Sequence, residues 1–248
     1  MEIVSRVVDA GIGLDAAGLA YGGCAYAALW PASQLFGRTL IAPPRPNELA
    51  LTFDDGPNPR WTPQLLEILA RHNIRATFFM VGKYAQTQRP LVRQMHEAGH
   101  LIGNHTWSHP NLALTSQRRI QEELSSTTAE LESITGAQVR YFRPPFGARR
   151  PATLRIAREQ GLIPVLWNAM TTDWSTPTPE LIAASLSAKI ERNRQRGNAS
   201  NIVLHDGSHL AQEADRMASV IATEKLLATL TNGKYVTPEI WKETAYRR

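Results

Sequence analysis

Short apolar runs alternate with helical patterns along most of this chain, and this alternation constrains the fold more than any other feature. Seven runs of strand length are separated by six stretches of helical periodicity. The expected strands are 48–53, 76–81, 101–104, 139–142, 163–167, 201–204 and 234–237, and the expected helices are 61–72, 90–98, 115–135, 151–160, 179–193 and 214–231. Such alternation predicts an α/β fold with a parallel sheet, either open or closed into a barrel.

The N-terminal part of the chain differs in composition from the rest. Residues 11–30 contain a single charged residue, Asp15, and are long enough to span a bilayer, although Ala and Gly dominate them. We interpret this segment either as membrane-associated or export-related, or as a helix packed on the domain, and residues 41–47 as a Pro-rich linker. The predicted organisation is an N-terminal segment, one α/β domain and a basic tail, over residues 1–47, 48–240 and 241–248.

The charge balance is basic, with 27 Lys and Arg against 22 Asp and Glu and a net charge of +5. Clustered arginines indicate solvated helix faces, or attraction to an anionic surface such as a cell wall or lipid headgroups. Nucleic acid is disfavoured, because no binding motif is present and aromatic residues are not interleaved with the basic clusters. The single cysteine excludes an intrachain disulfide, and no feature specifies an oligomeric state.

Ionisable residues gather where the predicted strands end. In barrels and open α/β sheets, the carboxyl ends of the strands meet at one edge, and active sites are built there. The residues concerned follow five different strands and are Asp54 and Asp55, His105 and His109, Arg143, Asp173 and Trp174, and His205 and Asp206. The sequence therefore predicts a catalytic site at this edge.

Two histidines four residues apart, in NHTWSHP, suggest a metal site. His105 and His109 can present both imidazoles to one point, as on one helical turn. With one Asp from another strand end, they would leave coordination positions open, as catalytic metal sites do. His205 and His209, in HDGSH, form a competing pair. Gly207 disfavours a continuous helix between these two histidines. His205 stands at a strand end, where a single histidine suits an acid or base better than a metal-ligand pair.

The paired acids of TFDDGP, Asp54 and Asp55, are expected to have different roles. Adjacent side chains of a strand diverge, so only one can face a given metal. The other can take a proton from a water whose pKa the metal lowers. A simple turn is the alternative for DDGP taken alone. Arg143, beside two prolines, would keep a catalytic carboxylate ionised or else form a structural salt bridge.

The motifs TFDDGP, HTWSH, RPPFG, DW and LHD, in this order, resemble the five motifs of the polysaccharide deacetylases, carbohydrate esterase family 4. That family includes chitin, chitooligosaccharide and peptidoglycan N-acetylglucosamine deacetylases, and the resemblance covers roughly residues 48–237. It implies a distorted (β/α) barrel of about seven parallel strands in a single domain. It also implies a hydrolase that removes N-acetyl groups from N-acetylglucosamine-type residues of a polymer or oligomer, at the cell envelope or outside the cell.

The resemblance also assigns the roles around the metal. Asp54 would be the general base, held by Arg143. Asp55 would bind the metal together with His105 and His109. A divalent metal is implied, with Zn²⁺ expected and Co²⁺ or another divalent ion as alternatives.

The remaining roles concern the acid and the substrate. His205 would be the general acid that protonates the departing amine, and Asp173 would pair with it and raise its pKa. The residues that would contact the substrate are Pro145, Phe146, Trp174, Val203 and Leu204. The backbone N–H of Phe146 would also stabilise the oxyanion. Phe146 stands where many family members have Tyr, so it lacks a hydroxyl that could contact sugar.

Three other functions fit parts of the pattern. The same scaffold could serve a deacetylase or deformylase of a lipid-linked amino sugar, for which the N-terminal segment leaves room. A carbohydrate-binding domain without catalysis is the alternative from another class, although every expected catalytic position holds a competent residue. An iron oxygenase with two histidines and one carboxylate is disfavoured by the βα alternation.

Overall fold

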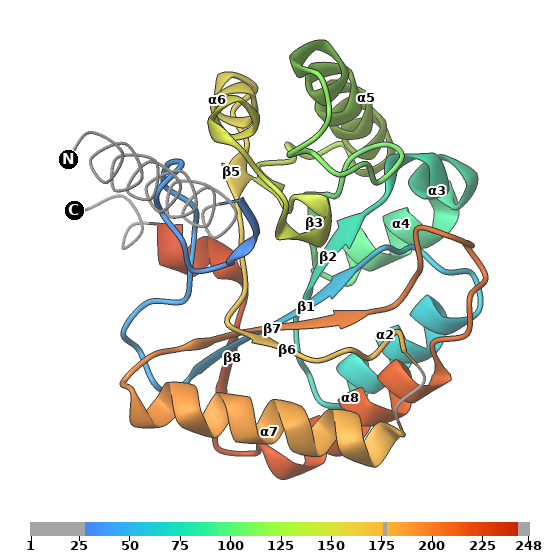
Figure 1. Ribbon diagram of the computed structural model, residues 1–248. Coiled ribbons are helices and arrows are strands. Elements are labelled where there is room, and N and C mark those ends of the chain that lie inside the picture. The colour runs from blue at the N-terminus through green and yellow to red at the C-terminus, as the bar shows by residue number, and fades with distance from the viewer. Residues whose placement is uncertain (1–27, 176–177, 243–248) are drawn as a thin grey trace, which may run out of the picture.

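One curved parallel sheet forms the centre of the computed structural model, which describes residues 28–175 and 178–242 (Figure 1). The hydrogen-bonded order is β5-β4-β3-β2-β1-β7-β6, and β8 pairs with the first residues of β1. The registered strand pairs are all parallel. The strands are β1 Glu48–Asp54, β2 Thr77–Met80, β3 Leu101–Asn104, β4 Tyr141–Phe142, β5 Ile163–Pro164, β6 Ala169–Met170, β7 Ser200–His205 and β8 Lys234–Val236.

The sheet confirms the predicted distorted barrel. Within the described part of the chain no ladder joins β5 to β6, so the barrel stays open between these two strands. The predicted strand 163–167 ends at Pro164, and β6 was not predicted. Both departures have one cause: a strand of two residues is too short to show a period of two in the sequence.

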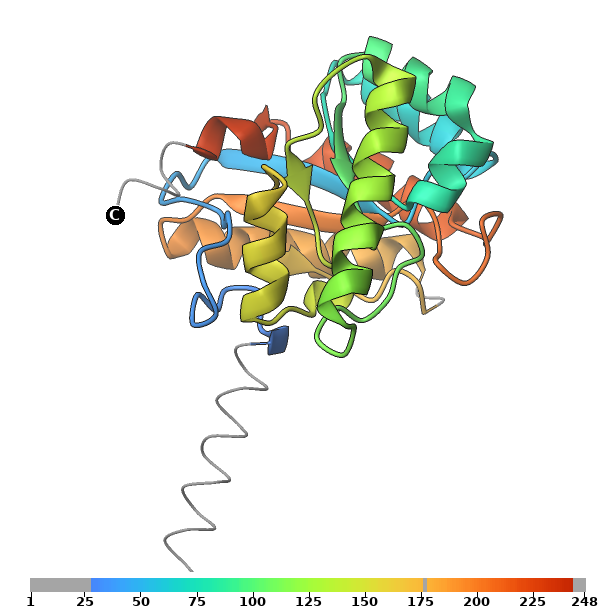
Figure 2. The ribbon, with the colours of Figure 1, turned by 90° about the horizontal axis from the view of Figure 1, so that it is seen from above.

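Helices surround the sheet, and they follow the predicted pattern with one addition (Figures 1 and 2). The six-residue helix α3 was not predicted, because it is too short to show a 3.6-residue period. Helix α5 begins at the side-chain cap of Ser116 and ends at Gly136 in the left-handed conformation. The helices are α2 Trp61–Arg71, α3 Gly82–Thr87, α4 Arg89–Glu97, α5 Gln117–Thr135, α6 Pro151–Glu159, α7 Pro179–Gln195 and α8 Met217–Thr229, with 3₁₀ turns η1 Pro145–Gly147 and η2 Pro238–Trp241.

Strand β1 is buried on both faces, and its alternation separates the core from the barrel interior. Leu49, Leu51 and Phe53 join the large hydrophobic core between sheet and helices. Thr52 and Asp54 alternate with them and point the other way, because successive side chains leave opposite faces of a strand. The interior beneath the carboxyl ends of the strands is therefore lined by polar groups.

The described part of the predicted N-terminal segment is packed on the domain. Leu40 is fully buried and forms a parallel bridge with Val165. Further along, Ala199 N–H donates to Pro43 O and Lys234 N–H donates to Asn47 O, each at 2.8 Å. The predicted linker over 41–47 thus runs along the domain with hydrogen bonds to it.

Residues 1–27, which hold most of the apolar segment predicted over 11–30, lie outside the described residues. Among the residues that are described, no helix is both long and apolar enough to cross a membrane.

Trp241, which the sequence analysis placed in the C-terminal tail, belongs to the domain. Its side chain is completely buried in a small cluster with Leu40 and Phe79, and its indole N–H donates to Glu48 Oε2 at 2.8 Å. The domain therefore extends at least to this residue.

Replacing Trp241 with Ala should lower the free energy of unfolding by about 3–5 kcal/mol, because it empties a large buried site. Urea denaturation followed by circular dichroism measures this loss. The neighbouring Ile240→Ala, at a partly exposed position, should change stability by less than about 1 kcal/mol. A Trp241→Ala protein as stable as the Ile240→Ala protein would show that the C-terminal turn is dispensable.

Candidate active site

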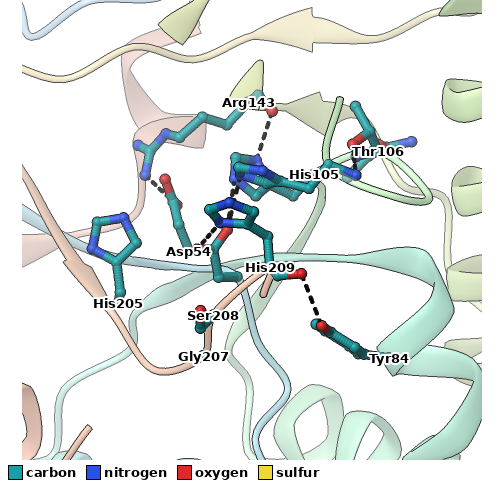
Figure 3. Close-up of polar contacts among 12 residues, drawn as sticks. Asp54, Tyr84, His105, Thr106, Arg143, His205, Gly207, Ser208 and His209 are labelled. Atoms are coloured by element: carbon teal, nitrogen blue, oxygen red, sulfur yellow. Dashed lines mark hydrogen bonds and ion pairs between the residues drawn. The ribbon is translucent and has the colours of Figure 1, made fainter. Parts of the chain in front are cut away.

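The two acids of TFDDGP diverge, as the sequence predicts. Asp54 ends β1, and its Oδ1 lies 2.7 Å from Arg143 Nη1. Asp55 follows with a left-handed backbone, at a φ of 71°, and its carboxylate turns to the histidines of the loop after β3. The change of backbone conformation between the two residues sends their carboxylates to different partners (Figure 3).

Arg143 is fully buried and held from several sides. Its Nη1 also donates to Thr52 Oγ1 at 2.7 Å, and its Nε donates to Val165 O at 3.3 Å. The guanidinium lies 4.1 Å from the ring centroid of Phe79. Burial lowers the pKa of Arg143, and the charge of Asp54 opposes this shift. These contacts fix the guanidinium, so the Asp54 carboxylate has one preferred orientation.

His105 and His109 lie in the loop after β3 rather than on a helical turn. Thr106 and His109 both have left-handed backbones, with φ of 68° and 61°. Side chains stabilise this shape: Thr106 N–H donates to Asn104 Oδ1 at 2.8 Å, and His109 N–H donates to Thr106 Oγ1 at 3.0 Å. The loop nevertheless brings both imidazoles to Asp55.

Asp55, His105 and His109 form a buried group suited to a divalent ion. Their candidate ligand atoms all lie within 4.8 Å of one another. Asp55 Oδ1 is 3.4 Å from His105 Nε2 and 3.0 Å from His109 Nε2, yet this oxygen has no hydrogen-bond partner. A buried carboxylate oxygen left unpaired among imidazole nitrogens is the arrangement that an ion would satisfy.

The protonation states of Asp55 and His109 also suit an ion. Burial alone would raise the pKa of Asp55, but its contacts with His105, His109 and His209 hold that pKa well below its usual range. Burial lowers the pKa of His109. An ionised carboxylate and neutral imidazoles are the forms that bind a metal. His105 Nδ1 lies 2.7 Å from Arg143 O, which leaves Nε2 free to face the ion.

His205 pairs with Asp173 on the other side of the cleft. His205 Nδ1 is 2.8 Å from Asp173 Oδ1, and Asp173 Oδ2 accepts from His205 N–H and from Ser219 Oγ. Burial alone would lower the pKa of His205, but the charge and hydrogen bond of Asp173 raise it to about 9, with help from Asp55 and Asp54. His205 therefore has its own acidic partner, and the competing pair with His209 is not the ligand group.

A cleft of about 660 Å³ opens over these residues. Phe146, Trp174 and Val203 line it, as the sequence analysis expected. Pro145 and Leu204 are buried and do not line it. Leu204 joins the core between sheet and helices, because it follows Val203 on the strand and so points to the opposite face.

Several residues of the site carried no signal in the sequence. Thr52 and Ser219 look like ordinary polar positions of a strand and a helix, yet they hold Arg143 and Asp173. Trp167 and Met170 also line the cleft. His209, also in the cleft, does carry a signal in the sequence, which is its four-residue spacing from His205.

Glycines allow the loops after β1 and β7 to pack against each other. A Cβ at Gly207 would lie 2.2 Å from Asp55 O, and a Cβ at Gly56 would lie 2.3 Å from Asp206 Oδ2. Asp206 also accepts a 2.5 Å hydrogen bond from Thr62 Oγ1, and burial raises the pKa of its carboxyl to about 7. The acid of the LHD motif thus joins the two loops.

Comparison with known proteins identifies the family of this chain. The family model for polysaccharide deacetylases matches residues 42–165. The chain belongs to the polysaccharide deacetylase family. A chitooligosaccharide deacetylase of Azorhizobium caulinodans is 40% identical over 162 residues, covering 65% of this chain and 74% of that protein. A peptidoglycan-N-acetylglucosamine deacetylase of Bacillus cereus is 36% identical over 179 residues, covering 70% of this chain but only 62% of the relative's length.

Solved structures of the same family superpose on this polysaccharide deacetylase-family fold. A family 4 acetyl xylan esterase from Clostridium thermocellum, in complex with a cobalt ion, has a TM-score of 0.69 and 28% identity, covering 79% of this chain and 91% of that one. A family pseudoenzyme from Bacillus anthracis has a TM-score of 0.69 and 25% identity, covering 78% of this chain and 64% of that one. The fold alone therefore does not specify activity.

The His205–Asp173 pair should make the stability of this family member depend on pH. A raised pKa contributes stability that is fully present below the ordinary histidine pKa of about 6.5 and is lost as the pH rises through about 9. Asp173→Asn should remove this contribution. Denaturation of both proteins between about pH 6 and pH 10 measures the difference between their curves.

Ser219→Ala provides the control for this measurement. It removes one hydrogen bond to Asp173 but leaves the charge, so its pH dependence should follow that of the unmodified protein. An unchanged pH dependence in Asp173→Asn would contradict the assigned charge pairing.

Proposed function

We propose that this protein is a metal-dependent hydrolase that removes N-acetyl groups from N-acetylglucosamine-type residues of a polysaccharide or oligosaccharide. One observation carries the proposal: the buried group of Asp55, His105 and His109 shares one cleft with an Asp54–Arg143 pair and a His205–Asp173 pair. The names of the Azorhizobium and Bacillus cereus relatives support the substrate class.

The proposed ion is Zn²⁺, held by Asp55, His105 and His109. Two imidazoles and one carboxylate suit zinc and leave positions open for substrate. Such a donor set also accepts cobalt, which the Clostridium thermocellum structure contains. When bound, the ion would polarise the amide carbonyl and make a nearby water more acidic.

Asp54 would act as the general base. Its carboxylate lies beside the ion site without belonging to it, and Arg143 holds it at 2.7 Å. The guanidinium orients this carboxylate, and an ionised carboxylate is the form that accepts a proton. Asp54 would take the proton of the attacking water.

His205 would act as the general acid. Asp54 and His205 are register partners on the adjacent parallel strands β1 and β7, so both side chains point to the same side of the sheet. With a pKa of about 9, the His205 imidazole carries a proton at neutral pH and can give it to the departing nitrogen. Acetate and a free amine would be the products.

Phe146 and Trp174 would hold the sugar and its acetyl group. Phe146 is 52% exposed and Trp174 is 44% exposed, although both are large apolar side chains on the cleft. Val203 would form the wall against the acetyl methyl, together with Trp174. The backbone N–H of Phe146 would donate to the carbonyl oxygen as negative charge develops, a contact worth about 3 kcal/mol in comparable sites.

The presence of all the proposed catalytic groups argues against a carbohydrate-binding domain without activity. Family membership is not sufficient by itself, since the Bacillus anthracis neighbour is named a pseudoenzyme. Here the proposed base, acid and ligands are all residues that can perform these roles, and each has a specific partner.

The cell envelope is the proposed place of action. The substrate class of the Bacillus cereus relative and the net charge of +5 support it, because cell walls are often anionic.

Acetate release from a panel of chitooligosaccharides, peptidoglycan fragments, acetylated xylan and a lipid-linked N-acetylated amino sugar tests the proposal. We expect release from at least one of the first two, loss of release with a chelator, and recovery when zinc is added. Acetate release only from the lipid-linked sugar or only from xylan would show that the proposed substrate class is wrong and that this other compound represents the substrate. Binding without release from any of them would contradict a hydrolase.

Replacing Asp54 and Asp55 in two separate variants should distinguish catalysis from ion binding. Asp55→Ala should lose the ion, because it removes a ligand. Asp54→Asn should keep it and lower kcat by about 10²–10⁴, the usual contribution of a general base. Zinc affinity is measured by competition with a chromophoric chelator, and turnover by acetate release.

Asp54→Asn also leaves Arg143 without its ion-pair partner, so its unfolding midpoint is measured and the assays are run well below it. Equal loss of zinc in both variants would contradict the proposed division of roles.

A further inference from the structure

His209 lies against the candidate ion site but has no part in the reaction proposed above. Its Nδ1 is 3.6 Å from Asp55 Oδ2, whereas His105 and His109 both face Asp55 Oδ1. The side chain is 30% exposed, at the cleft surface. Because the two oxygens of one carboxylate meet different histidines, His209 is placed to act on the ligand rather than on the ion.

The two histidines of the ion group are oriented by different means. His105 Nδ1 contacts Arg143 O at 2.7 Å. His109 Nδ1 is buried and has no hydrogen-bond partner among the described residues. Metal-binding histidines normally fix their ring through the nitrogen that does not face the metal. The ring of His109 must therefore be oriented by packing.

His209 and Phe146 provide this packing. The rings of His209 and His109 are stacked, with centroids 4.2 Å apart and planes inclined by 16°. Phe146 meets His109 edge-on, with centroids 4.7 Å apart and planes inclined by 76°. The stacked ring of His209 and the perpendicular ring of Phe146 together restrict rotation of the His109 imidazole.

The backbone around His209 is anchored, so the stack rests on a fixed support. The Tyr84 hydroxyl donates to His209 O at 3.1 Å (Figure 3). Three residues further on, Gln212 Nε2 donates to Thr87 Oγ1 at 2.9 Å. Both contacts join the loop after β7 to helix α3.

We propose that His209 is a positioning residue of the ion site. Its ring holds the imidazole of His109 in the orientation that faces the ion, and it occupies the Oδ2 side of Asp55, with Nδ1 3.6 Å from that oxygen. His209 is not itself one of the ligands, since the group whose donor atoms converge consists of Asp55, His105 and His109. This inference rests on the proposed function, because it concerns the same ion.

Zinc affinity of the His209→Ala protein tests the inference. Competition with a chromophoric chelator should show affinity reduced about tenfold or more, the usual effect of removing a group that orients a ligand. With Co²⁺ in place of zinc, the visible absorption bands should shift, because the geometry of His109 around the ion changes. His209→Phe keeps a flat ring against His109 and should recover part of the affinity.

Leu210→Ala is the matched control, because Leu210 is the next residue of the loop and is exposed. It should leave zinc affinity and the Co²⁺ spectrum unchanged. Thermal unfolding of the metal-free proteins checks that each variant is folded.

The outcomes separate this inference from the proposed function. If the unmodified protein binds zinc and His209→Ala binds it within about twofold, the inference is wrong and the proposed function stands. Affinity in His209→Phe as low as in His209→Ala would overturn the role of ring stacking, and an equal loss in Leu210→Ala would overturn the role of the ring altogether. Absence of zinc binding in the unmodified protein would contradict the proposed function itself.

Discussion

A single buried residue, Arg143, connects the two halves of the candidate site. Its side chain donates to Asp54, and its main-chain oxygen contacts His105 Nδ1. The proposed base and one proposed ion ligand are therefore positioned by the same residue. Because a buried charge is costly without partners, Arg143 also requires Thr52 and Val165, so the barrel interior and the site depend on each other.

Separate partners distinguish the ionisable groups of the cleft. Asp54 has a guanidinium, Asp55 has imidazoles, and His205 has the carboxylate of Asp173. The environments push the pKa of Asp55 down and that of His205 up, although burial opposes both shifts. Asp54 and Asp55 have the same intrinsic acidity, and their different partners support the proposed roles of Asp54 as base and Asp55 as ligand.

The positions of these groups depend on tight packing of loops rather than on long elements. Two of the strands that lead to the site are short, since β3 has four residues and β4 only two. Gly207 lets one loop approach the main chain of Asp55, and Asp206 bridges to Thr62. A member of this family can lack activity and still have the fold, as the name of the Bacillus anthracis neighbour, a pseudoenzyme, indicates.

The sequence by itself determined the parallel α/β architecture and the edge of the sheet where the site lies. Alternation of apolar runs is a local property, and the parallel sheet turns it into an ordered edge that brings Asp54, His105 and His205 together. The same period of two could have excluded Leu204 from the cleft, since Val203 points into it. What local patterns cannot contain are elements too short to be periodic, such as β6 and helix α3.

Only the tertiary structure decided which groups meet across the barrel. Two of these contacts join residues distant in the chain: the Ser219 hydroxyl donates to Asp173, and the ring of His209 stacks on His109. A third feature is the left-handed backbone of His109, a conformation that no single residue type specifies. Such contacts depend on how the loops pack in three dimensions. The residues next to a side chain in the sequence do not indicate which residues lie next to it in space.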